Sequence, residues 1–212
     1  MLKNKIILAL LILFETSGLH AIELQPAFYG GFQSGYGSTT WRGLVPPDVK
    51  QNEAILISTP KATNEGGIAY GFFGGYEFST HFAVEGFYLR YPKADIYFIK
   101  DSIFAYEHDR CSFNSFSTAI GLLAKLMLPL PNTPFRLFST VGFAHNQRKD
   151  EIYEEALFSP SFGAGIVFNM TTHLMAQLGF NYIAGYGESE LSPINSFIPF
   201  LYSGTLGFAY RF

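Results

Sequence analysis

The chain has 212 residues, a length that suits a single domain or one large β-barrel. Aromatic residues make up 17% of it and charged residues only 15%, which is the reverse of the composition of a disordered protein. The net charge of −3 predicts no basic surface for nucleic acid, and the single cysteine, Cys111, excludes an internal disulfide and a cysteine-rich zinc site.

Residues 1–21 have the organisation of a secretory signal peptide. Two lysines precede an apolar run of nine residues, and small residues follow it. Cleavage after Ala21 is expected, with a cut after Gly18 as the alternative, so the mature domain is predicted to be 22–212. The apolar run is too short for a membrane-spanning helix, which needs about 20 residues.

From residue 27 onward the chain alternates between large apolar residues and small or polar ones with a period of two. This is the spacing of a β-strand, in which successive side chains point to opposite faces. Eight segments show the pattern, so eight strands are predicted. They lie at about 27–36, 68–78, 82–91, 116–128, 135–145, 162–169, 174–182 and 202–212.

The connections between these strands alternate between short and long. Three are tight turns, at 79–81, 129–134 and 170–173, and four are longer and polar, at about 37–66, 92–112, 146–158 and 184–196. In an antiparallel meander this alternation places all the short turns at one end. The predicted fold is therefore all-β, an eight-stranded antiparallel up-and-down transmembrane β-barrel with short periplasmic turns and four long extracellular loops.

Charge placement predicts which face of each strand meets lipid. Of the 28 charged residues in the predicted mature chain, 21 fall in the four long loops. On the strands, only Arg90 lies on the apolar face, near the loop end of its strand, whereas five charges lie on the small, polar face. Arg or Lys facing lipid at the midplane costs ~2–4 kcal/mol, so the apolar face is expected outside and the polar face in the lumen. A soluble barrel of the lipocalin type would have the opposite polarity, with apolar residues inside.

Closure of the sheet in lipid requires the last strand to pair with the first.

Three stretches resemble the OmpA-like eight-stranded outer-membrane barrels of bacteria. The run 68–78 (IAYGFFGGYEF) followed by 82–88 (FAVEGFY) resembles their second hairpin, and 135–144 resembles their fifth strand. The ending Phe208-x-Tyr210-x-Phe212 resembles the signal read by the barrel-assembly machinery.

The resemblance implies a small, porin-like protein of the cell outer membrane of a Gram-negative bacterium, with a structural, adhesive or weak pore role. It implies outer-membrane lipid, lipopolysaccharide, the assembly machinery and periplasmic chaperones as partners. Because the chain stops at Phe212, the peptidoglycan-binding domain that some relatives carry after the barrel is not expected.

The charges of the polar face are expected to share one layer of the lumen near the short turns, where Gln177 and Asn169 can join them. An eight-stranded interior is just wide enough for side chains to fill, so this ionic layer is predicted to plug the barrel. A path or gate for ions through the layer, giving a narrow, low-conductance pore, is the alternative. The layer consists of Glu77, Glu85, Lys125, Arg136 and Arg211.

A lipid-A-modifying enzyme is a further alternative, because some outer-membrane barrels have that activity. Such chemistry needs a base beside a nucleophile near the outer leaflet, and His145 has a suitable depth, with Ser159 or Ser161 on the next strand. A surface histidine is the ordinary interpretation, so no enzymatic activity is expected. No cofactor or metal is expected either, since no two histidines have ligand spacing on one strand.

The long loops are expected to carry recognition, for instance of a host or matrix ligand, because loops on a rigid scaffold commonly do so. The first loop contains Trp41 and an apolar run at 54–58 that could extend the barrel as a hairpin or contact a partner. The third, with mixed charge at 148–155, is expected to be solvated. The sequence thus favours a structural or surface-interaction role of the adhesin kind.

Overall fold

The computed structural model of the protein describes residues 26–48, 52–187 and 197–212, so the predicted signal peptide lies outside the described residues. Three short helices, η1 (Trp41–Leu44), α2 (Glu53–Leu56) and α3 (Ile103–His108), lie in the connections. Within the described ranges no helix is long and apolar enough to span a membrane. The strands are β1 (Ala27–Ser38), β2 (Ala62–Asn64), β3 (Gly67–Ser79), β4 (Phe82–Arg90), β5 (Ala94–Tyr97), β6 (Ser112–Pro129), β7 (Phe135–Asp150), β8 (Glu154–Asn169), β9 (Leu174–Ile183) and β10 (Leu201–Arg211).

Eight of these strands close into an antiparallel barrel, as predicted. Their order around the wall is β1, β3, β4, β6, β7, β8, β9 and β10, and β10 pairs with β1 to complete the ring. In that last seam Phe32 lies opposite Phe208 and Ser34 opposite Leu206. An open edge in hydrocarbon would leave unpaired N–H and C=O groups, each costing several kcal/mol, and the seam removes that edge.

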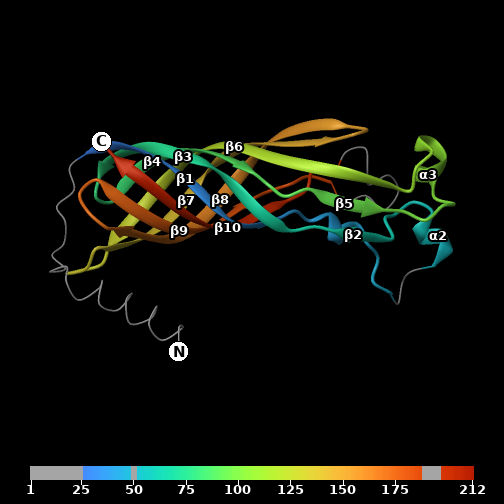
Figure 1. Ribbon diagram of the computed structural model, residues 1–212, viewed down its shortest axis with the longest axis horizontal. Helices are drawn as coiled ribbons and strands as arrows, with labels where there is room; N and C mark the ends of the chain where they lie inside the picture. Colours follow the sequence, from blue (N-terminus) through green and yellow to red (C-terminus); the bar gives the residue numbers. More distant parts are fainter. Residues whose placement is uncertain (1–25, 49–51, 188–196) are drawn as a thin grey trace, which may run out of the picture.

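The two ends of the barrel differ. Figure 1 shows the C-terminal end of β10 and the short β3–β4, β6–β7 and β8–β9 turns at one end of an elongated molecule. The small elements β2, β5, α2 and α3 lie at the other. The short turns predict that the first end is periplasmic and the second extracellular, and the two ends are named accordingly below.

The barrel wall continues beyond the predicted strand ends on the extracellular side. Strands β7 and β8 form one long hairpin that turns only at 151–153, so the predicted loop at 146–158 is wrong. The carboxylate of Asp150 closes the turn by accepting hydrogen bonds from the backbone N–H groups of Ile152 (3.0 Å) and Tyr153 (2.6 Å). The loop was predicted because the segment is rich in charged residues. Paired strands outside the lipid, however, tolerate charged side chains on both faces.

Two further predicted loops contain regular structure. Strand β5 pairs with the extracellular part of β6, beyond the end of β4, and β2 pairs with β5, so the wall is lengthened there. Of the two alternatives for the run 54–58, the hairpin is not formed, because residues 53–56 form α2. Asn52 caps that helix by accepting a hydrogen bond from the N–H of Ile55 at 2.9 Å, the usual role of Asn at a helix start.

Large and small side chains alternate across the lumen. Phe73 packs over Gly207 and Phe138 over Gly165, where an added methyl group would come 2.8 Å and 2.6 Å from the respective ring. Glycines on the inward face therefore provide room for the aromatic rings that fill it. The outward face is apolar and exposed, as predicted, with Phe32, Phe72, Leu122, Phe143 and Phe180 among its side chains.

Candidate functional site

The predicted lumen charges lie in two ion-paired groups near the short-turn end. In the first group, Glu77 accepts hydrogen bonds from Arg136 and from Arg211, both at 2.8 Å. Arg136 also donates to the side-chain oxygen of Asn169 at 3.2 Å. This group holds two positive charges and one negative charge.

In the second group, Lys125 donates to Glu85 and to Gln177, both at 2.7 Å. The hydroxyl of Tyr29 donates to the same Glu85 oxygen at 2.8 Å. Tyr29 was missed by the sequence reasoning, which gave aromatic residues no polar role. Its position on the small face of its strand, with Gly31 and Gln33, is the signal that places it in the lumen.

Together the two groups take one buried side chain from each of the eight barrel strands. Burying an ion costs several kcal/mol, and only close pairing with additional hydrogen bonds offsets it. Through its own hydrogen bonds each group joins strands across the lumen, and the two groups together form the ionic layer. Its members, in strand order from β1, are Tyr29, Glu77, Glu85, Lys125, Arg136, Asn169, Gln177 and Arg211, none more than 6% exposed.

A second, apolar layer lies at the extracellular end. Side chains from three connections and from the inner face of β6 pack together there. Trp41 and Phe113 meet edge to face at 5.6 Å between ring centroids, and Trp41 and Phe197 at 4.8 Å. The buried members of this layer are Trp41, Ala94, Ile96, Phe98, Phe104, Phe113 and Phe197.

Arg148 joins this layer, contrary to the prediction of a solvated loop. Its side chain and that of Asp150 are both 0% exposed, and the two groups are joined by a hydrogen bond of 2.7 Å. The guanidinium lies 4.7 Å from the ring centroid of Trp41 and donates to the carbonyl of Phe197 at 2.7 Å. Burial lowers the pKa of Arg148 from its usual value, and Asp150 opposes that shift.

Small polar side chains lie at the level of the apolar layer and just below it, where Ser115 pairs with Asp150 and Ser117 with Arg148. The hydroxyls of Ser115, Ser117 and Ser159 are buried and have no hydrogen-bond partner among the described residues. Groups of this kind are ordinarily satisfied by water. The middle of the lumen, nearer the ionic layer, is filled mainly by buried apolar side chains, among them Phe73, Phe87, Leu89 and Leu123.

The catalytic arrangement considered from the sequence is not formed. His145 lies on the outward face, where its ring packs against Phe158 at 5.0 Å, whereas Ser159 and Ser161 are buried on the inward face of β8. The approach of these serines to His145 that the enzyme alternative required is therefore not formed, because the barrel wall separates them. The described ranges contain no cluster of three or more His, Cys, Asp or Glu residues that could hold a metal ion.

The aromatic residues of the C-terminal signal lie at the short-turn end. Phe208 and Tyr210 face outward on β10, and Phe212 follows the strand with 77% of its surface exposed. Their reading by the assembly machinery stays a prediction.

The sequence profile of the family described as outer membrane protein beta-barrel domain matches residues 6–212. The chain belongs to this family. No curated protein sequence matches it.

Solved structures of other outer-membrane barrels share the architecture. Neisserial surface protein A has a TM-score of 0.52 at 12% identity, over 89% of this chain and 99% of that one. OprG of Pseudomonas aeruginosa has a TM-score of 0.52 at 11% identity, over 92% of this chain and 99% of that one. The N-terminal barrel of Pseudomonas aeruginosa OprF has a TM-score of 0.49 at 14% identity, over 90% and 100%. At these identities the likeness concerns the fold alone.

Removing one charge of the second group should destabilise the barrel. Lys125→Met leaves Glu85 buried without a cation and should lower the free energy of unfolding by about 3–5 kcal/mol. Adding Glu85→Gln should recover much of the loss, because no uncompensated charge then remains. Urea unfolding in lipid vesicles, followed by the fluorescence of the single tryptophan, measures both effects.

The control is Lys149→Met, which removes a lysine whose ion pair with Glu154 is exposed and should change stability little. Equal effects of Lys125→Met and Lys149→Met would contradict the assignment of Lys125 to a buried ionic layer.

Proposed function

We propose that this outer-membrane barrel is closed to solutes and acts at the cell surface through its extracellular elements. The proposal rests on the ionic layer, whose two groups together place one side chain from each of the eight strands across the periplasmic part of the lumen. Attraction between charges is stronger in such a water-poor interior than in solution, which favours a network that stays formed. The aromatic layer at the extracellular end supports the proposal as well, because it fills space at the opposite end of the lumen.

Exposed apolar side chains at the extracellular tip supply a candidate contact surface. Ile103 is 46% and Tyr106 92% exposed, both on α3, and Ile57 beside α2 is 39% exposed. The N–H of Ile103 donates to the carbonyl of Ile57 at 2.8 Å, which joins the two helices. Figure 1 shows both helices at the end farthest from the C-terminus. Apolar groups gathered in water commonly mark an interaction site, here for a host or matrix ligand.

The proposal includes a route for export and assembly of the barrel. Residues 1–21 would direct export, and Phe208, Tyr210 and Phe212 would present the chain to the assembly machinery with the help of periplasmic chaperones. The extracellular elements then project from the outer leaflet.

A narrow, low-conductance pore is the second candidate. The unpartnered hydroxyls of Ser115, Ser117 and Ser159 favour it, because buried hydroxyls of this kind are ordinarily satisfied by water, here toward the extracellular end of the lumen. Conduction would require the ionic layer and the aromatic layer to open together.

Planar-bilayer recordings of the refolded protein separate the two candidates. The wild-type barrel should show no steady conductance, because both layers remain closed. The double variant Glu85→Gln, Lys125→Met should also show no steady conductance, because the group of Glu77, Arg136 and Arg211 and the aromatic layer are unchanged. A large, steady conductance of the wild type would refute the closed lumen and support the pore.

Adherence of cells that display the barrel tests the surface role. Ile103→Ser combined with Tyr106→Ser should reduce binding to host cells or matrix-coated surfaces severalfold, because the tip loses its exposed apolar groups. Tyr186→Ser is the matched control, since Tyr186 is 64% exposed in a different extracellular connection. Adherence that is unchanged in the tip variant, or reduced equally in the control, would contradict a ligand site at the tip.

A further inference from the structure

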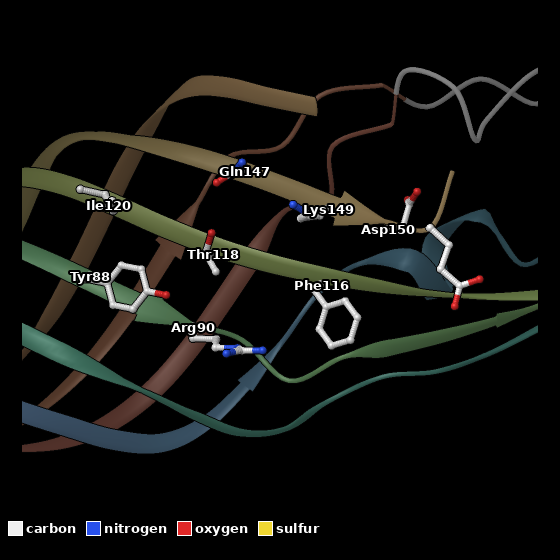
Figure 2. A pocket seen from close by; sticks show the side chains of 9 residues that line it. Tyr88, Arg90, Phe116, Thr118, Ile120, Gln147, Lys149 and Asp150 are labelled. Carbon is white, nitrogen blue, oxygen red and sulfur yellow. The ribbon is translucent and has the colours of Figure 1, made fainter. Parts of the chain in front are cut away.

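A groove lies on the outside of the barrel wall, at the level where β4 ends and β6 and β7 leave the membrane. Its volume is about 540 Å³. Figure 2 shows side chains from these three strands around it. Its lining includes Tyr88, Arg90, Phe116, Thr118, Ile120 and Lys149.

The strand register orders this lining from apolar to basic. On the membrane side, Tyr88 pairs with Ile120 across β4 and β6. One step toward the loops, Arg90 pairs with Thr118. In the next outward row Phe116 pairs with Lys149. The groove is therefore apolar on the membrane side and cationic at its outer rim.

The depth of the basic row matches the surface of the outer leaflet. Leu128 and Thr118 are ten residues apart on the outward face of β6. At a rise of ~3.3 Å per residue and a tilt of ~40°, ten residues climb about 25 Å, the height of the apolar band of such barrels. Arg90, beside Thr118, thus lies where lipid headgroups begin.

Arg90 is exposed and has no carboxylate within ion-pair distance among the described residues. Lys149 pairs with Glu154 at 3.4 Å, but both side chains are more than half exposed. An exposed pair of this kind is weak and can exchange partners. Both cations can therefore be offered to an anion.

Acidic residues at the far end of the groove are already engaged. Asp150 is held by Arg148 and by two backbone N–H groups, and Glu151 is paired with Arg110. The side-chain amide of Gln147 donates to Glu154 at 2.8 Å. The positive charge of the groove is consequently concentrated around Arg90.

We propose that this groove binds a phosphorylated lipid of the outer leaflet, of the lipid A class. Arg90, with Lys149, contacts a phosphate, and the hydroxyl of Thr118 lies beside it as a further donor. An acyl chain packs against Tyr88, Phe116 and Ile120. The planar guanidinium suits a phosphate because it can donate two parallel hydrogen bonds. The site would fix the depth of the barrel in the outer leaflet.

Native mass spectrometry of the folded protein in detergent tests the site with lipid A as the probe. Wild-type protein should retain lipid A and should bind lipid A freed of its phosphates about tenfold more weakly or worse, since the charge-assisted hydrogen bonds are lost. Arg90→Gln should lower the affinity for intact lipid A to a similar extent, and Arg90→Lys should restore part of it. Arg42→Gln is the matched control, because Arg42 is exposed on η1 outside the groove.

Equal binding of the two lipids by wild-type protein would overturn the proposal, and this arm depends on no variant folding. Equal affinity of Arg90→Gln and Arg42→Gln would overturn the assignment of the phosphate to Arg90. Displacement of lipid A by inorganic phosphate at millimolar concentration would show a general anion site and refute recognition of a lipid.

Discussion

The pairing of the last barrel strand with the first is the constraint on which the rest of the structure depends. Inside hydrocarbon each unpaired backbone group costs several kcal/mol, so the sheet must close on itself. Closing it with eight strands leaves a lumen only as wide as the side chains that fill it. The glycines beneath Phe73 and Phe138 follow from that width, since neither ring would fit above a larger residue.

The narrow lumen also explains the form of the ionic layer. Five charged side chains are buried where little water can solvate them, so each must find its partners within the wall. Glu77 has two arginine partners, and Glu85 has a lysine and a tyrosine hydroxyl. Because every strand contributes one member, the network holds the strands in register as well as filling the space between them.

The period-two pattern predicted the strands, their faces and the five lumen charges, because that pattern follows directly from closure in lipid. It did not predict where the wall stops. Arg148 has the same parity as Arg136 along β7, and extending the alternation would have placed it inside. The short helices depend on distant contacts: Glu65 accepts hydrogen bonds from Thr39 and from the backbone of η1, a pairing that local sequence does not specify.

Disulfide trapping across the β1–β10 seam tests closure most directly. In a Cys111→Ser background, Ser34→Cys with Leu206→Cys places two thiols at directly paired outward positions, whereas Ser34→Cys with Tyr210→Cys places them four residues out of register. Oxidation of the lipid-embedded protein should cross-link the first pair and leave the second largely reduced. Failure of the first pair to cross-link, or equal cross-linking of both, would contradict a closed barrel with this seam.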